Sequence, residues 1–229
     1  DDDDNYSQIW KSPLPMYSLE ASTSDDISKY LTIQTDYVQP FGDYKIESGA
    51  KLSYQTLDND YHYLYANSEG TMIDDANKTN HFIYGERVIA AYGIFSGKIS
   101  DLSYHIGLRA EQTNVDTDLK TTNTKNSKDY FGLFPSASLS YKITNADEVQ
   151  INYSRRINRP RSRFINPFTD YSDPNTLRTG NPDLDPEYID AYEIAYVKGF
   201  KGFSITPNLF YRKTHDKISF ITEIVSNGV

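Results

Sequence analysis

The stretch that decides the fold is NYSRRINRPRSRFINPFTDYSDPNTLRTGNPDLDPEYIDAYEIAY, from Asn152 to Tyr196. Five arginines lie between Arg155 and Arg163, although the formal net charge of the chain is -9. A segment dense in Pro, Asn and Asp follows, and these residues favour turns because Pro fixes φ and Asn and Asp bond to nearby backbone. Apolar and polar residues alternate before the arginines and again after this segment. The stretch therefore predicts two strands joined by a long folded loop.

Composition restricts the class of protein. The 229 residues include 20 Tyr and 11 Phe, yet only 38% are hydrophobic and the mean hydropathy is -0.65. Such a chain suits a wall that faces an apolar phase on one side and water on the other, as in a membrane barrel. A tyrosine-rich soluble β-sandwich has a similar composition, so both remain open at this point. The absence of Cys excludes disulfides and thiolate metal sites, and no apolar run is long enough for a membrane helix.

Apolar and polar residues alternate with a period of two along most of the chain. In KIESGAKLSYQ, for example, Ile46, Leu52 and Tyr54 share one face of a strand, and polar residues occupy the other. Many of the predicted strands reach the about 9–11 residues that a tilted membrane-spanning strand needs. They lie near 29–39, 43–56, 80–95, 98–113, 129–144, 147–156, 187–199, 202–214 and 217–226. We expect the leucines of the apolar columns to face lipid: Leu52, Leu108, Leu139 and Leu209.

Two of the predicted strands place a carboxylate in an apolar column. In HFIYGERVIAAYG (81–93), Glu86 shares a face with aromatic and aliphatic residues, and Asp190 does so in the strand at 187–198. A charge that faces lipid is costly at mid-depth. Either a bulge shifts the register of these strands, or their tyrosines face the interior, and the sequence leaves both open.

Short and long connections alternate along the chain. Short turns are predicted at 39–44, 95–101, 143–148 and 198–202, and long polar loops at 57–79, 114–128 and 157–186. Outer-membrane barrels show this alternation because their periplasmic turns are short and their outer loops are long. The sequence therefore predicts an all-β, antiparallel transmembrane β-barrel with the three long loops outside. Residues 1–28 are expected to form a polar loop or lead-in, and residues 29–229 the strands.

The block from Tyr153 to Tyr196 resembles the barrel of TonB-dependent outer-membrane receptors, and is most similar to the outer-membrane β-barrel protein family. Its most specific element is GNPDLDPE at 180–187, followed by an aromatic strand that contains Glu193. Three upstream segments resemble successive strands of the same barrels in the same order: 36–54, 81–93 and 105–113. The resemblance covers roughly residues 30–225.

The resemblance implies a receptor of the bacterial outer membrane that binds a scarce ligand outside and imports it with energy from TonB. Such barrels have about 22 strands around a plug domain, so the about nine strands expected here form a barrel fragment. The implied partners are outer-membrane lipid, the TonB complex through an N-terminal region absent from this chain, and a surface lipoprotein. The implied ligand is a small molecule, a glycan or a peptide.

The arginines have two interpretations. In the structural one, they pair with acidic neighbours and outer-leaflet phosphates. In the functional one, some hold an anionic ligand, because guanidinium offers a fixed fork of donors to carboxylate or phosphate. Alternation places Arg156 in the interior column, with Arg159 and Arg163 at the mouth. The candidate ligand-binding residues are Arg156, Arg159, Arg163 and Tyr171. The sequence pI of about 4.9 argues against nucleic acid as a partner.

Other chemistry finds little support in the sequence. The histidines lack the spacing of metal sites; they are His62, His81, His105 and His215. No Gly-rich phosphate loop opens a helix, and no Ser elbow with a His partner is found. We therefore expect no catalytic residues, no metal, no cofactor and no enzymatic activity. Two alternatives remain open: a passive or structural outer-membrane barrel, and a soluble glycan-binding β-sandwich.

Overall fold

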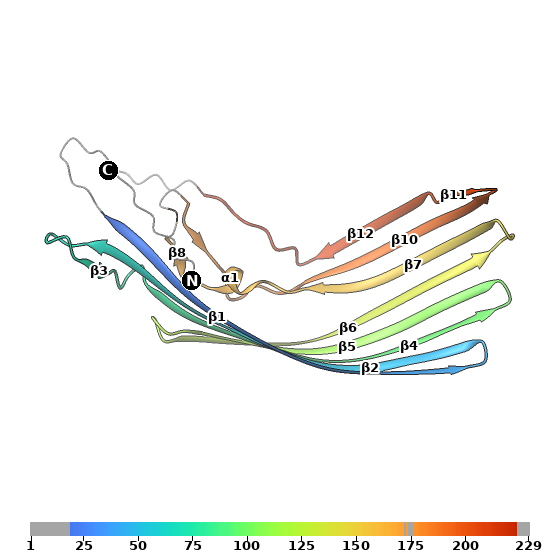
Figure 1. Ribbon diagram of the computed structural model, residues 1–229, viewed down its shortest axis with the longest axis horizontal. Coiled ribbons are helices and arrows are strands. Elements are labelled where there is room, and N and C mark those ends of the chain that lie inside the picture. The colour runs from blue at the N-terminus through green and yellow to red at the C-terminus, as the bar shows by residue number, and fades with distance from the viewer. Residues whose placement is uncertain (1–18, 172, 174–175, 224–229) are drawn as a thin grey trace.

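A computed structural model describes residues 19–171, 173 and 176–223 of the chain. They form one curved antiparallel sheet whose long strands pair in chain order, β1-β2-β4-β5-β6-β7-β10 (Figure 1). β11 and β12 both pair with β10, and β3 pairs with β2. The strands of this sheet are β1 (Glu20–Phe41), β2 (Tyr44–Ala66), β3 (Met72–Asp74), β4 (Asn80–Ile99), β5 (Leu102–Leu119), β6 (Thr124–Lys142), β7 (Asp147–Asn158), β10 (Glu187–Phe200), β11 (Phe203–Ile205) and β12 (Asn208–His215). The prediction of an all-β antiparallel meander is confirmed.

The two faces of the sheet differ in chemistry. Cross-strand partners point to the same side, and the register places four leucines on one face, here called the apolar face: Leu52, Leu108, Leu139 and Leu209. Large apolar side chains are exposed on it; Leu209, for example, is 74% exposed. The opposite face, here called the polar face, carries neighbours such as Ser53 and Ser138. The sheet bends around the polar face, and the loop between β7 and β10 lies in its hollow (Figure 1).

No second layer of described residues covers the apolar face. Among the described residues, the other sheet is the two-stranded pair of β8 (Thr169–Asp170) and β9 (Arg178–Thr179), which belongs to the loop in the hollow. A β-sandwich keeps its core between two sheets, and the described residues do not form that arrangement. The one helix in the described part, α1 (Ser162–Ile165), spans four residues. No helix there is long and apolar enough to cross a membrane.

Aromatic rings form a belt on the apolar face beside the short turns. Phe41 and Tyr44 lie 5.8 Å apart between ring centroids, Tyr44 and Phe95 5.9 Å, and Phe95 and Tyr104 5.6 Å. These residues come from four successive strands, β1, β2, β4 and β5. Barrel proteins place such aromatic girdles at the membrane interface. The belt therefore marks one boundary of the lipid-facing band.

The connections alternate between the two ends of the sheet. The tight turns that follow β1, β4, β6 and β10 gather at one end, and the connections that follow β2, β5 and β7 gather at the other (Figure 1). Gly42 and Gly202 lie in two of the tight turns with φ of 61° and 96°, a backbone region that favours glycine. The end that carries β3, α1 and β8 is here called the loop end.

The strands at the loop end are longer than expected. β2 continues to Ala66, and β5 and β6 leave only residues 120–123 between them, so much of the expected loops at 57–79 and 114–128 is strand. β1 begins at Glu20, within the expected lead-in. Ladder hydrogen bonds do not require apolar side chains, and the Thr and Tyr residues of these segments favour strands. The polar side chains in the sequence indicate where the apolar band ends, but the strands continue beyond that point.

The last part of the chain differs from the prediction. The strand expected at 202–214 is interrupted at Thr206 and Pro207, because Pro has no N–H to donate to a ladder. The backbone N–H of Tyr196 donates to the Pro207 carbonyl at 3.1 Å and keeps the break against β10. Of the strand expected at 217–226, residues 217–223 form no strand, and 224–226 lie outside the described residues.

The two carboxylates in apolar columns have different explanations. The register of β4 and β10 runs without a bulge. In β4 the column of Tyr84 and Glu86 lies on the polar face beneath the loop, so these residues do not face lipid. In β10 the column of Asp190 and Tyr192 belongs to the apolar face. Asp190 lies at the loop-end edge of that face, in the row of Arg155, where strands leave the apolar band.

Candidate functional site

The polar face carries two adjoining features: a docked loop and an open depression. The loop covers residues 159–186 and is here called the roof. It contains α1, β8 and β9, and it joins two neighbouring strands, β7 and β10. It nevertheless reaches across the hollow of the sheet to β4, β5 and β6. A segment that crosses the interior in this way can close part of the mouth of a barrel.

Apolar packing fixes the middle of the roof. Ile165 of α1 is buried against Phe82, Tyr84 and Leu119 of β4 and β5, with Phe168 and Leu184 packed around them. This is the main cluster of buried hydrophobic residues in the described part of the chain. It lies on the polar face, so the core of the structure is the contact between the roof and the wall. Burying such side chains contributes about 1.5–3 kcal/mol each.

Gly180 explains part of the GNPDLDPE element. Its N–H donates to the Asn166 carbonyl at 2.9 Å, and the N–H of Asn181 donates to the Phe164 carbonyl at 2.7 Å. A Cβ atom at position 180 would lie 2.5 Å from the Asn166 oxygen and 2.6 Å from the Phe164 oxygen. Only glycine fits there without a backbone shift. The element therefore closes the roof on itself beside α1.

Charged contacts hold the base of the roof. Arg159 Nη2 donates to Glu111 Oε2 at 2.5 Å and to Thr113 Oγ1 at 3.1 Å, and its Nε lies 3.9 Å from Glu86 Oε2. Glu111 and Thr113 are buried, at 8% and 0% exposure. Lys128 holds the other end of the roof. Its Nζ donates to the backbone carbonyls of Asp183 and Leu184, each at 3.0 Å, and lies 2.7 Å from the Asp185 carboxylate.

The open depression lies on the polar face of β6, β7, β10 and β12. Its polar lining includes Ser136, Ser138, Asn152, Arg156, Glu193 and Arg212. Ser138 Oγ donates to Asn152 Oδ1 at 2.6 Å. The arginine ion pairs among the described residues involve Arg109 and Arg159, so the guanidinium groups of Arg156 and Arg212 have no ionic partner there. This surface can accept an anionic or hydrogen-bonding partner.

The four candidate residues from the sequence lie in different surroundings. Arg156 is exposed and lines the depression, on the interior column as expected. Arg159 is held by Glu111. Arg163 is exposed on α1, with its guanidinium 4.8 Å from the Phe164 ring. Tyr171 packs its ring edge-on against Phe168, with centroids 6.0 Å apart. Arg156 is thus the member of the set that lines the depression.

Sequence reasoning did not single out two residues that matter here. Glu111, the partner of Arg159, stands 48 residues earlier in the chain. Arg212 lies in the depression with Arg156 but belongs to β12. The alternation in each strand predicted the face of these residues. Which residues become neighbours depends on the register between strands, and no local signal encodes it.

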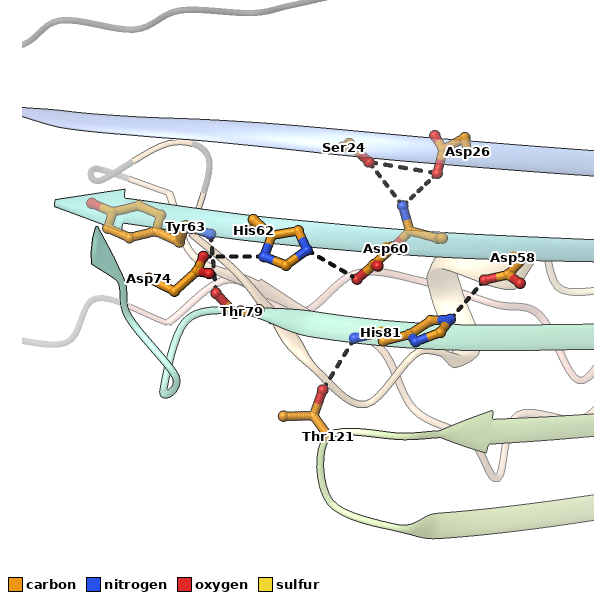
Figure 2. Close-up of polar contacts among 11 residues, drawn as sticks. Ser24, Asp26, Asp58, Asp60, His62, Tyr63, Asp74, Thr79, His81 and Thr121 are labelled. Atoms are coloured by element: carbon orange, nitrogen blue, oxygen red, sulfur yellow. Dashed lines mark hydrogen bonds and ion pairs between the residues drawn. The ribbon is translucent and has the colours of Figure 1, made fainter. Parts of the chain in front are cut away.

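The histidines at the loop end pair with aspartates (Figure 2). His62 Nδ1 lies 3.0 Å from Asp74 Oδ1 and its Nε2 lies 3.5 Å from Asp60, and His81 Nε2 lies 2.7 Å from Asp58. The hydrogen bond with Asp74 raises the pKa of His62 above its ordinary value. The described residues contain no group of three or more side chains placed to hold a metal ion. These pairs fasten β3 and β4 to β2 beyond the apolar band.

Comparison with known proteins supports the fold. The sequence profile of the Outer membrane protein beta-barrel family matches residues 1–229. Curated proteins give no match. Among solved structures, the copper transporter OprC has a TM-score of 0.64 at 10% identity, over 89% of this chain and 32% of that chain.

Two further structures give similar values. The ferric citrate transporter FecA, in the unliganded form, has a TM-score of 0.58 at 14% identity, over 86% of this chain and 29% of that chain. The ferric yersiniabactin uptake receptor FyuA from Yersinia pestis has a TM-score of 0.57 at 12% identity, over 87% of this chain and 30% of that chain. At these identities the likeness is one of fold. The chain spans about a third of the length of the transporters it resembles.

Proposed function

Because the chain belongs to the Outer membrane protein beta-barrel family and forms part of a barrel of the bacterial outer membrane, we propose that it is one wall of a receptor. This receptor imports a scarce ligand with energy from the TonB complex. The observation that carries the proposal is the curved sheet itself. One face is apolar and exposed, and the other is polar, hollow and partly roofed. A polar interior that is partly filled by a docked loop fits a receptor whose path is closed at rest.

The similar structures support this class of function. They are a ferric citrate transporter, a copper transporter and a ferric yersiniabactin uptake receptor. These cargoes differ, so they do not select a ligand for this chain; a small molecule, a glycan or a peptide fits the proposal. The proposed role is transport rather than catalysis. The proposed partners are outer-membrane lipid, a surface lipoprotein over the mouth, and the TonB complex.

Within this receptor, we assign Arg156 to the wall of the ligand path, with Arg163 and Tyr171 on the roof at the mouth. Arg159 acts indirectly, because its ion pair with Glu111 positions the roof. A charge-assisted contact in a site partly shielded from water is worth about 1.5–3 kcal/mol. For an anionic ligand, Arg156→Ala should therefore weaken binding to the full-length receptor about tenfold or more. Arg155→Ala, on the opposite face of the same strand, is the matched control.

Two measurements on the full-length protein separate an energised receptor from a passive barrel. In planar bilayers a barrel that contains a plug should stay closed, and 4 M urea, a denaturant, should open it as the plug unfolds. The purified protein should also bind the isolated C-terminal domain of TonB. A stable open conductance without denaturant, together with no binding to TonB, would overturn the proposal in favour of a passive barrel.

A further inference from the structure

The sheet divides between β6 and β7 toward the loop end (Figure 1). The ladder between these strands begins beside their tight turn and stops at the pair of Ser136 and Ser154. The pairing of β6 with β5 nevertheless reaches Thr124. The segment of β6 from Lys125 to Leu133 therefore pairs on one side only, and its other side is here called the open edge. A strand that closed the barrel would pair with β1 or β12, so it would not cover the open edge.

Pro135 explains where the division begins. Successive residues of an antiparallel strand direct their backbone groups to alternate sides. On the β5 side, the N–H of Lys142 donates to the Asp101 carbonyl at 3.0 Å. On the β7 side, the N–H of Ile143 donates to the Asp147 carbonyl at 2.9 Å. The register between β5 and β6 has no bulge, so the odd-numbered residues of β6 direct their backbone groups toward the β7 side. Pro135 is one of these residues, and it has no N–H to donate there.

Side chains rather than backbone hydrogen bonds fill the gap beyond Pro135. Phe134 of β6 stacks on Tyr188 of β10, with ring centroids 6.4 Å apart. The Arg109 guanidinium lies 5.1 Å from the centre of the Phe134 ring. The Arg155 guanidinium lies 5.2 Å from the centre of the Tyr188 ring. These four side chains form one stack across the base of the gap, and none of them supplies a backbone partner to the open edge.

The open edge presents a row of backbone donors and acceptors. By the alternation above, the N–H and C=O groups of five residues point outward from it: Lys125, Ser127, Asp129, Phe131 and Leu133. No backbone hydrogen bond joins these residues to β7 or to the roof in the described part of the chain. All five residues are exposed, Phe131 at 61% and Leu133 at 49%. An unpaired row of this kind is a template for another strand.

The roof lies beside this half of β6 without pairing with the open edge. Asn126 Nδ2 donates to the Pro182 carbonyl at 3.3 Å, and Lys128 Nζ donates to two further roof carbonyls, each at 3.0 Å. Both contacts come from even-numbered side chains, which lie on the polar face. Pro182 and Pro186 cannot donate to a ladder, and this hinders pairing of the roof segment with β6. The open edge therefore stays free for another segment.

We propose that the open edge binds an extended peptide as an added antiparallel strand. The free groups are backbone donors and acceptors at strand spacing, which match another backbone better than a glycan or a small chelate. The side chains of the peptide that lie opposite Phe131 and Leu133 are apolar, because cross-strand partners share a face and contact each other. The inference rests on the proposed function for the outer position of the edge, and it deepens that function by naming a peptide as the ligand.

The test uses a fluorescent synthetic peptide, as long as the open edge, in which Val and Thr alternate between terminal Lys residues. In an antiparallel ladder, peptide residues opposite the odd-numbered residues direct their own N–H groups toward β6. The Val residues take these positions, opposite Phe131 and Leu133. A peptide N-methylated at every Val should therefore bind at least about tenfold more weakly, and one N-methylated at every Thr should bind like the unmodified peptide. Fluorescence anisotropy with the full-length protein in detergent measures the affinities.

A variant of β6 tests the same contact from the side of the protein. Ser127→Pro removes one N–H from the open edge and leaves the ladder with β5 intact, because Ser127 directs its backbone groups away from β5. This variant should bind the unmodified peptide at least about tenfold more weakly than the wild type. Ser127→Ala keeps the N–H and should bind like the wild type. Heat-modifiable migration in gels checks folding, and if Ser127→Pro does not assemble, the two methylated peptides decide the question on the wild type.

Three results would overturn the proposal: no binding of the unmodified peptide by the wild type, equal binding of the two methylated peptides, or equal binding by the two Ser127 variants. Self-association of the wild type that Ser127→Pro abolishes, without peptide binding, would assign the edge to a second copy of the chain instead. Binding is measured without transport. A failure here therefore leaves the proposed import standing, and a failure of import leaves the peptide site standing.

Discussion

The arginines that begin with Arg155 lie in distinct surroundings, which are set by strand parity and by the start of the roof. Arg155 stacks on Tyr188, whose ring in turn stacks on the buried Phe134 of β6. Arg156 faces the depression. Arg159, just past the end of β7, turns into the hollow and pairs with Glu111. A basic run in an acidic chain is therefore not one basic patch. The sequence could predict that Arg155 and Arg156 point to opposite faces of β7, but it could not predict that Glu111 is the partner of Arg159.

The ion pair between Arg159 and Glu111 should hold the roof closed. Removing one partner of a buried pair leaves an uncompensated charge and costs on the order of 3 kcal/mol. Arg159→Met should therefore expose the roof to added chymotrypsin and speed hydrogen exchange at the Gly180 amide, while the barrel stays assembled. Glu111→Gln in the same chain should recover part of the protection. Arg163→Met, on the exposed side of α1, is the control and should cleave like the wild type. Equal cleavage of both Met variants would contradict the role of Arg159.

At the scale of elements, the extension of β2 and its contact with β3 should depend on pH. The pKa of His62 is raised chiefly by its hydrogen bond with Asp74. A raised pKa in the folded state means that the contact is at full strength below the ordinary value of about 6.5 and weakens as pH rises through the raised value. Asp60, on the same strand, also faces the imidazole and acts in the same direction.

A spin label at Ser68→Cys, in the connection after β2, reports this change. Its mobility should be low at pH 5.5 and should increase by pH 8. Asp74→Asn should give the mobile spectrum at both pH values, and Asp58→Asn, which changes the partner of His81 instead, should keep the transition. A label whose mobility does not change with pH in the wild type would show that the His62 contact does not control this connection.

The connections should sort by side of the membrane. In intact cells a bulky maleimide should label single cysteines at Ser68, Thr122 and Arg178, in the loop-end connections, and should spare Ser100 and Ala146 in the tight turns. The chain has no cysteine of its own, so each signal reports one site. Permeabilised cells provide the control, in which all five should react. Labelling of the tight turns in intact cells would contradict the proposed orientation.

Strand positions were predictable because lipid on one side and water on the other impose a period of two on the side chains. Strand ends were less predictable. The polar residues of β2 beyond Leu57 resemble a loop in sequence, yet they pair with β1 and β4 through backbone hydrogen bonds. The break before β12 has a local signal, Pro207, which lies within an apolar alternation that suggested a continuous strand. Backbone pairing and side-chain polarity are separate constraints, and the sequence pattern reports chiefly the second.

At the scale of the molecule, the described chain is a curved wall with an exposed apolar face. Among the described residues, β1 pairs only with β2 and β12 pairs only with β10, so each has one unpaired edge. In a closed barrel every strand is paired along both edges. The fold was predictable because it depends on periodicity. The candidate site was predictable only in part: Arg156 followed from alternation, but the depression combines it with Arg212 through the pairing of three strands. Long-range register determines such a site, and a single sequence does not encode it locally.

The central claim is that one face of this sheet contacts lipid and the other lines a water-filled or protein-filled interior. Adjacent residues of β6 test it most directly, because Leu139 and Ser138 differ by one position and lie on opposite faces. Spin labels at each position, in the full-length protein in liposomes, are compared for collisions with oxygen, which concentrates in lipid, and with a water-soluble nickel chelate. We predict that the label at 139 collides mainly with oxygen and that the label at 138 does not. Equal oxygen and nickel accessibility at the two positions would contradict the account.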